Sequence, residues 1–359
     1  MSRIAAVAPV LPEFAYPQDE ITAAIAPLLT ADSSTSRAVL KRLHAACGVR
    51  TRHLAIPLDR YRDLDSFDTA NDLFITLGTD LAERALRDAL NAAGLAPRDV
   101  DFILFTSVTG ISAPSIDALL VARLGMRRDV KRVPVFGLGC VAGAAGIARV
   151  HDYLAGHPGD VGVLVSVELC SLTLQHGDDS VANLVSSALF GDGATAVVMV
   201  GDERAAAMGP VGPDVVATRS CLYPDTEGVL GWDIGGSGFR IVLSANLADV
   251  VERHLGEDVA DLLAAHELKI RDIPTWVAHT GGPRILQAAA RSLDLPDGAL
   301  DLSWRSLERV GNLSSSGVLH VLADTLARGD QLPGEPGVLF AQGPGICAEL
   351  VLLRWPDED

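Results

Sequence analysis

The sequence predicts an α/β protein in which helices cover the faces of a sheet. Three short apolar runs, at 101–107, in the apolar part of 159–168 and at 275–279, have the composition of strands buried on both faces. Helical patterns accompany them, with apolar residues at spacings of three and four over 71–93, 114–124 and 283–293. Strands that alternate with helices are typical of an α/β fold.

Local signals mark the ends of these elements. Gly94 and Gly125 end the first two helices, and Pro283 suits the first turn of the third. Residues 1–11 are apolar but contain prolines and precede acidic residues, so we expect a first strand there and not a signal peptide. Residues 200–236 are rich in Gly, Pro and Asp and are expected to form a connection before the apolar run 239–243. A strand, a turn and a helix occur at 101–125 and again at 275–295, which suggests an internal duplication.

The composition excludes several classes of protein. Of 359 residues, 48% are apolar and 21% charged, as in a globular chain with a large core. The net charge of −17 argues against nucleic-acid binding, and no stretch is long enough to span a bilayer. The five cysteines have no paired spacing, so we expect neither disulfides nor a metal site, and a reducing cytoplasm as the location.

Cys140 has the most informative setting in the chain. A short apolar stretch, 133–136, is expected to form a buried strand, and Gly137 and Gly139 permit a tight turn after it. The small residues of 141–149 then predict a closely packed helix. A thiol at a helix N-terminus is favoured as the thiolate. Buried structural cysteines are also common, so this setting alone leaves both interpretations open.

Two residues far along the chain favour a catalytic role for Cys140. His279 ends a buried strand beside a glycine turn, and Asn312 lies in a Gly- and Ser-rich turn before the helical run 318–326. Each has a structural explanation by itself, as a core histidine and a helix N-cap. Together with a cysteine they suit nucleophilic catalysis on thioesters. A papain-like protease has a comparable order, but this chain lacks the sequence that surrounds the papain cysteine.

Several motifs together resemble the type III polyketide synthases, the chalcone-synthase-like branch of the thiolase superfamily. The resemblance covers about residues 35–355 and rests on GLGCVAGAAG, VELCSLTLQ, ALFGDGATAV, VAHTGGPRIL, RVGNLSSSGVL and QGPG. It implies a five-layered αβαβα fold with two related halves, 1–205 with the cysteine and 206–359 with the histidine and asparagine. It also implies a homodimer that takes CoA thioesters as substrates and needs no cofactor.

The family's functional residues map onto this sequence by motif. The resemblance implies that Cys140 is the nucleophile, with His279 and Asn312 as its partners, and that Phe190 and Phe239 guard the passage between a CoA tunnel and the cavity. Further residues are expected at the cavity or its floor: Ala113 (reaching the partner's site), Cys170, Thr173, Ser314, Gly343, Pro344 and Gly345. Gln342 and Ala341 depart from the family's usual loop, which leaves the shape of the floor open.

Basic residues provide candidates for binding the phosphates of CoA. A first cluster comprises Arg37, Lys41, Arg42, Arg50 and Arg52, and by the resemblance it lies where the family holds CoA. From this cluster we select Arg50 and Arg52 as the candidates. A second cluster, at 127–132, is equally well explained as a solvated face.

The resemblance implies an iterative reaction. Malonyl-CoA would be decarboxylated and condensed onto an acyl group on Cys140, and the chain would then cyclise. The stretches FGLGCVAGAAGIAR and ELCSLT, with the small Ala113, are most similar to bacterial synthases that use medium or long fatty acyl-CoA starters and make alkylpyrones or alkylresorcinols. The alternatives are a single-round β-ketoacyl synthase of fatty-acid initiation and an inactive binding partner.

Overall fold

The strands form one mixed sheet that is nearly divided in two at its middle. The computed structural model describes residues 1–30, 33–208 and 212–356. In order across the sheet, the strands are β11 (Thr275–Ala278), β12 (Pro336–Gly343), β13 (Cys347–Arg354), β8 (Asp214–Leu222), β1 (Ser2–Val10), β7 (Asp192–Gly201), β6 (Val161–Leu169), β4 (Phe102–Thr106) and β5 (Lys131–Val135). Only two residue pairs join β8 to β1, Ser2 with Val215 and Arg3 with Asp214. The sheet therefore consists of two groups of strands, one on each side of this junction.

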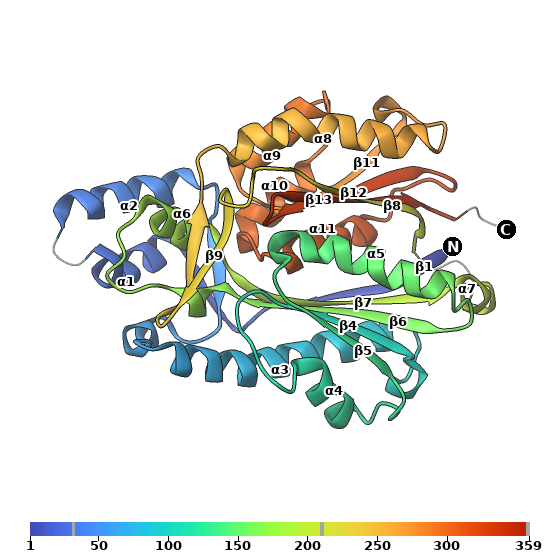
Figure 1. Ribbon diagram of the computed structural model, residues 1–359, viewed down its shortest axis with the longest axis horizontal. Helices are drawn as coiled ribbons and strands as arrows, with labels where there is room; N and C mark the ends of the chain where they lie inside the picture. The colour runs from blue at the N-terminus through green and yellow to red at the C-terminus, as the bar shows by residue number, and fades with distance from the viewer. Residues whose placement is uncertain (31–32, 209–211, 357–359) are drawn as a thin grey trace.

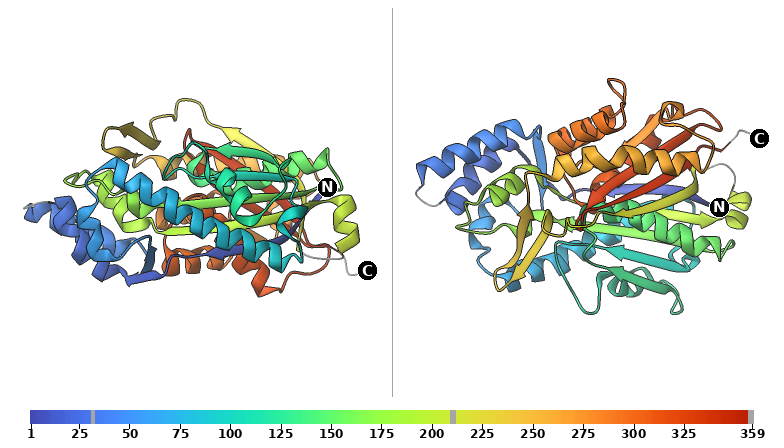
Figure 2. Two further views of the ribbon diagram at one scale, coloured as in Figure 1. Left: turned by 90° about the horizontal axis from the view of Figure 1, so that it is seen from below. Right: turned by 45° about the horizontal axis from the view of Figure 1, so that its top comes forward.

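Helices and the two groups of strands alternate in five layers. The middle layer is α5 (Ala142–Ala155) and α11 (Ser315–Arg328), which lie between the two groups and contact both (Figure 1). On the outer faces, α3 (Phe67–Ala92) and α4 (Ile116–Leu124) cover one group, and α8 (Leu247–Ala264) and α9 (Pro283–Ser292) cover the other. The views in Figure 2 show the same arrangement, with α3 lying across its strands. The predicted αβαβα layering is confirmed.

The remaining elements lie around these layers. They are α1 (Gln18–Thr30), α2 (Ser34–Ala46), α6 (Val181–Leu189), α7 (Asp202–Met208), α10 (Asp301–Val310), the pair β2 (Phe14–Pro17) and β3 (Thr51–Leu54), the hairpin β9 (Leu230–Gly235) and β10 (Gly238–Leu243), and the 3-10 turns η1 (Leu58–Asp63), η2 (Pro97–Asp99), η3 (Gly139–Val141), η4 (Cys170–Thr173) and η5 (Ile270–Asp272). Helices α1, α2 and α6 lie at one end of the layers and α7 at the other (Figure 1). No helix of the described residues is long and apolar enough to cross a membrane.

Small residues allow the middle layer to pack closely. The first five residues of α5, from Ala142 to Gly146, are all buried. A Cβ atom added at Gly143 would collide with the backbone oxygen of Ser315, and one at Gly146 would lie 2.5 Å from Cδ1 of Leu164. The run of Gly and Ala therefore brings α5 into close contact with both α11 and β6.

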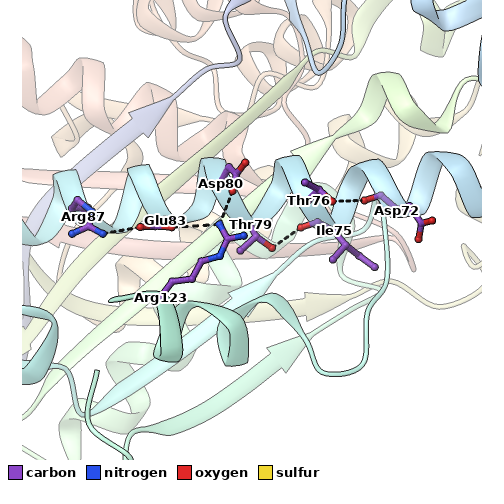
Figure 3. A network of polar contacts seen from close by, with 8 residues as sticks. All are labelled: Asp72, Ile75, Thr76, Thr79, Asp80, Glu83, Arg87 and Arg123. Atoms are coloured by element: carbon purple, nitrogen blue, oxygen red, sulfur yellow. Dashed lines mark hydrogen bonds and ion pairs between the residues drawn. The ribbon is translucent and has the colours of Figure 1, made fainter. Parts of the chain in front are cut away.

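The outer face of α3 carries charged contacts of a different kind. Arg123 of α4 donates to Asp80 and Glu83 on α3, and Arg87 donates to Glu83 one turn further on (Figure 3). All four side chains reach solvent. Exposed pairs of this type stabilise a fold by only about 0–1 kcal/mol, so the buried layers account for most of the stability.

Most predicted elements are present, and two expectations were wrong. The three buried strands and three helices lie where the sequence predicts them, and Gly125 ends α4 with φ of 64°. However, β5 is exposed and not buried, with Val133 40% exposed, because it is the last strand of the sheet. The segment 200–236 is also more than a connection, since it contains α7, β8 and β9.

The close contact between α5 and α11 predicts a specific sensitivity. Gly143→Ala should lower the free energy of unfolding by about 1–3 kcal/mol, because the added methyl group has no space against the backbone of α11. Gly156→Ala is the matched control, since its Cβ would have only an ordinary contact at 3.7 Å. Denaturant unfolding of both variants measures the difference, and equal stability of the two would contradict this packing.

Candidate active site

Cys140 lies in the turn between β5 and α5. The turn uses left-handed backbone conformations at Gly137 (φ 97°) and Gly139 (φ 57°), which favour glycine. A Cβ at Gly139 would also lie 2.7 Å from Cδ of Pro344, so this glycine allows the loop after β12 to approach. Cys140 itself is buried in η3, directly before α5. The predicted position at a helix N-terminus is confirmed.

Asn312 is held by backbone contacts with the segment after α6. Its N–H donates to the carbonyl of Leu189 at 2.8 Å, and its carbonyl accepts from Gly191 at 3.0 Å. Its side-chain oxygen accepts from the N–H of Ser314 at 2.8 Å. Ser314, the residue before α11, has φ of 48°, an uncommon conformation for a residue other than glycine. The thiol of Cys140 points to the Ser314 hydroxyl, with 3.8 Å between Sγ and Oγ.

His279 reaches the same turn of α11 from the other side. It follows β11, and its N–H donates to the carbonyl of Phe340 at 3.0 Å. A Cβ at Gly317 would lie 3.2 Å from Nδ1 of His279, so the helix lies against the ring. Cys140, Asn312 and His279 therefore lie around the first turn of α11. Among the described residues, neither ring nitrogen of His279 has a hydrogen-bond partner.

Burial controls the protonation of the thiol and the imidazole. The pKa of Cys140 is raised to about 12, chiefly by burial and in part by the Glu168 carboxylate, although hydrogen bonds with Ser314 and Asn312 act in the opposite direction. Burial also lowers the pKa of His279 to about 4. Burial therefore opposes the effect of the helix terminus that favours a thiolate. Both shifts favour the neutral thiol and the neutral imidazole in the free protein.

Glu168 is a buried residue of the site that we did not predict. Its carboxylate, fully buried in β6, accepts hydrogen bonds from the N–H of Val108 at 3.1 Å and the hydroxyl of Thr109 at 3.0 Å. It also accepts from Ser314 at 3.1 Å, so Ser314 connects it to Cys140. Burial raises the pKa of Glu168. The sequence did contain a signal for Glu168, because it is a charged residue in the otherwise apolar strand predicted within 159–168.

Two adjoining cavities lie beside Cys140. The outer one contains Cys140, Ser314 and Pro344 in its wall. The inner one extends toward α1 and β3. Both are lined by Cys170, Thr173, Ser186, Phe190, Trp232 and Ile241. Cys170, Thr173, Ser314 and Pro344, which we expected at the cavity, lie in these walls.

The hairpin β9–β10 contributes to the walls of both cavities. Phe239 lines the inner cavity together with Phe190, and Ile241 lines both cavities. Trp232, the cross-strand partner of Ile241, lines both cavities and was not predicted. Its segment was interpreted as a connection, so the sequence offered no signal for it.

Other predicted residues lie away from Cys140. Ala113 is exposed at a loop tip and lines neither cavity of its own chain. Gly343 packs behind Val141, and Gly345 bends the chain with φ of 117°. Gln342 and Ala341 are buried in β12 and also line neither cavity.

The two arginines expected to bind CoA differ in their surroundings. Arg50 is exposed, and its Nε lies 2.5 Å from Oε1 of Glu308. Arg52 is 3% exposed and lines the inner cavity, so its expected contact with a CoA phosphate at the surface was wrong. In the second basic cluster, Arg127 forms ion pairs with Asp101 and Asp129. Such pairs are typical of a solvated face.

Nothing in the described part of the chain is arranged to bind a metal ion, since no three His, Cys, Asp or Glu residues are grouped for it. The groups that the site does offer for chemistry are a buried thiol, a neutral imidazole, a side-chain amide and a cavity to hold a chain attached to the sulfur.

Comparisons with known proteins agree with this geometry. Residues 2–203 match the N-terminal domain of chalcone and stilbene synthases, and residues 214–355 match their C-terminal domain. The chain is 57% identical over 352 residues to a 1,3,6,8-tetrahydroxynaphthalene synthase of Streptomyces peucetius subsp. caesius, covering 98% of this chain and 93% of that protein. It is 33% identical over 314 residues to a putative chalcone synthase of Bacillus subtilis, covering 86% of each.

The crystal structure of 1,3,6,8-tetrahydroxynaphthalene synthase from Streptomyces coelicolor, a bacterial type III polyketide synthase, superimposes on this chain with a TM-score of 0.92. The two are 29% identical, and the match covers 99% of this chain and 100% of that one. The chain belongs to the chalcone and stilbene synthase family and is a type III polyketide synthase.

Proposed function

We propose that this enzyme uses malonyl-CoA both as starter and as extender and makes 1,3,6,8-tetrahydroxynaphthalene. The observation that carries the proposal is the 57% identity, over 98% of the chain, to a synthase of that name. The proposed malonyl starter and naphthalene product replace the fatty acyl starter and the alkylpyrone or alkylresorcinol product that the sequence suggested. A relative described as an α-pyrone-synthesis polyketide synthase-like protein, from Mycobacterium tuberculosis, is only 29% identical.

The cavities support a short, oxygen-rich chain. Trp232, Phe190 and Ile241 narrow the space beside Cys140, which leaves little room for an extended alkyl chain. The wall of the inner cavity is mostly apolar, but it also presents polar groups, among them Arg52 and Asn183, that an alkyl chain could not use. A poly-β-ketone carries an oxygen on every second carbon and can use such polar contacts.

Cys140 and His279 perform the loading step in this proposal. A ring nitrogen of neutral His279 accepts the thiol proton as the Cys140 sulfur attacks the carbonyl carbon of the starter thioester. The bond to the CoA sulfur breaks, and CoA leaves with that proton as the free thiol. The new bond joins the acyl group to Cys140. Since thiol and imidazole are both neutral at rest, charge develops only while substrate fills the site.

His279 and Asn312 perform the extension step. Loss of carbon dioxide from the next malonyl-CoA leaves an electron pair that forms an enolate, and the two side chains donate hydrogen bonds to its oxygen. The enolate carbon attacks the thioester on Cys140 and displaces the sulfur. Transfer of the longer chain back to Cys140 allows another round.

The product fixes the stoichiometry. Its ten carbons come from five malonyl units, which lose five carbon dioxide molecules and release five molecules of CoA. One ring closes by attack on the thioester, and the other closes by an aldol reaction that loses one water. The result is C10H8O4, which accounts for every atom without an oxidant or a reductant.

The first prediction concerns starter choice. With malonyl-CoA as the only substrate, we expect the C10H8O4 product by liquid chromatography and mass spectrometry. Added fatty acyl-CoA should change its yield little, because the cavity beside Cys140 is narrow. Alkylpyrones formed only when a fatty acyl-CoA is added would contradict the proposal and support the fatty acyl alternative, whereas a single β-keto product would support the initiation synthase.

The second prediction separates the roles of two site residues. Cys140→Ala should abolish the polyketide, and Asn312→Ala should slow release of carbon dioxide from malonyl-CoA by about 10²–10³-fold through loss of one donor to the enolate oxygen. Cys221→Ala, a half-buried cysteine outside both cavities, is the control and should retain activity. Full product formation by Cys140→Ala would contradict its role as the nucleophile.

We further propose that the enzyme is a homodimer, that its halves divide at 205/206, and that it works in the cytoplasm. The exposed edge of the sheet at β5 supports the dimer, because unpaired strand edges associate readily. Val133 and Phe136 beside this edge are 40% and 46% exposed. The free state of all five cysteines suits a reducing compartment.

The third prediction tests the dimer. The wild-type enzyme should sediment as a dimer, and Val133→Glu should shift it toward monomer by placing a charge on the strand edge. Val181→Glu, at a residue 66% exposed on α6, should leave the dimer intact. A monomeric wild-type enzyme at micromolar concentration would rule out this interface.

A further inference from the structure

Arg52 of β3 is a buried cation in the wall of the inner cavity. It is 3% exposed, and its aliphatic stem packs beside two glycines. A Cβ at Gly311 would lie 3.3 Å from Cγ of Arg52, and one at Gly191 would lie 3.7 Å from the same atom. The backbone therefore leaves space for the side chain to extend beneath the Phe190–Asn312 contact and reach the cavity.

The guanidinium is only partly satisfied by the protein. Nε donates to Oε1 of Gln18 at 3.0 Å, and Nη1 donates to the carbonyl of Phe190 at 2.7 Å. Nη2 is buried and has no hydrogen-bond partner among the described residues. Both groups that accept from Arg52 are neutral, so neither balances its charge.

Nearby carboxylates do not supply the missing partner. Asp192 is fully buried in β7, but its oxygens accept hydrogen bonds from the backbone N–H groups of Ala55 and Ser171 and from the Ser171 hydroxyl. No ion pair joins Arg52 to an acidic residue within the described chain. Burial lowers the pKa of Arg52 to about 10, which still leaves the guanidinium charged at neutral pH.

Asp192 attracts Arg52 only through space, without a hydrogen bond, and a buried charged group with an unpaired donor is unfavourable unless a ligand provides the partner. The inner cavity continues into the cavity of Cys140 through shared walls at Cys170 and Phe190. The far end of a chain attached to Cys140 can therefore extend toward Arg52. A malonyl-primed chain has the matching chemistry, since it ends in a carboxylate and carries ionisable β-keto oxygens.

We propose that Arg52 binds the anionic oxygens at the far end of the growing polyketide and thereby selects a malonyl-derived starter over an alkyl one. This inference rests on the proposed malonyl-primed reaction. The oxygens are those of the starter carboxylate or of an enolate in the chain. Arg52 acts on chain binding and starter choice, whereas Cys140, His279 and Asn312 act on the reacting carbons.

The test compares starters in wild type and Arg52→Gln. Chains primed by malonyl-CoA, by ¹³C-labelled acetyl-CoA and by hexanoyl-CoA are quantified by mass spectrometry. Arg52→Gln should lower malonyl-primed pentaketide about tenfold, the loss of one hydrogen bond to a charged group, and leave hexanoyl-primed extension within about twofold. A decrease for malonyl alone assigns the contact to the carboxylate, and a decrease for acetyl as well assigns it to enolate oxygens.

Two further variants control for charge and structure. Arg52→Lys should recover part of the malonyl-primed product, and Arg87→Gln, which removes an exposed arginine of α3, should behave as wild type. Equal loss with all three starters would show that Arg52 only supports the Phe190–Asn312 contact, and would overturn the inference. Unchanged products in Arg52→Gln would overturn it too.

Wild-type enzyme provides a measurement that does not depend on a folded variant. When malonyl-CoA and propionyl-CoA compete, intact-protein mass spectrometry should show at least about tenfold more malonyl-derived acyl group than propionyl group on the enzyme. Equal loading would overturn the inference and leave the proposed product possible. A wild-type enzyme that makes no malonyl-primed product would overturn the proposed function and this inference together.

Discussion

The close packing of the first turn of α11 against its neighbours is the constraint on which the site depends. Ser314 and Ser315 lie against the turn of Cys140, and Gly317 lies against His279, so one helical turn fixes the positions of both. Gly143 permits this contact from α5. Since α5 and α11 are the middle of five layers, strands on both sides hold the turn in place. Cys140 and His279, the proposed nucleophile and base, are brought together in this way although they lie far apart in the sequence.

The same burial determines the electrostatics. A thiol and an imidazole shielded from water are both neutral at rest, while Glu168 is satisfied by donors from the surrounding loops and from the start of α11. Arg52 is the exception, because its side chain lines the inner cavity and one of its donors has no partner among the described residues. Ions that form during the reaction are not stabilised by bulk water and depend on fixed donors. Such a site is suited to an enolate, whose negative charge exists only between decarboxylation and bond formation.

The sequence predicted the parts of the site that have local signals. Cys140, His279 and Asn312 each lie in a glycine-rich turn at the end of an apolar or helical run, and such turns can be recognised without a structure. Trp232 and Ile241 lack such a signal, because their position over the cavity depends on how a short hairpin folds against α6 and η4. Phe239 of the same hairpin was expected at the cavity through the family resemblance, and it lines the inner cavity with Phe190.

Exposure was harder to predict than secondary structure. The run 133–136 is apolar enough for a buried strand, but local hydrophobicity cannot show that no strand of the described chain lies beyond it. Arg52 illustrates the opposite error, since a basic residue in a polar segment suggests a surface and the fold buries it. The five-layered order was predicted through the family resemblance and not from the periodicity of the elements.

The proposed reaction depends above all on a malonyl-derived acyl group carried on the sulfur of Cys140. Its most direct test is to stop the wild-type reaction with malonyl-CoA by acid within its first turnovers, and then map the peptides by mass spectrometry. We expect acyl groups of increasing length on the peptide that contains Cys140. Acyl groups on the peptide of Cys170, the other thiol of the same cavity, with none on Cys140, would contradict the proposed reaction.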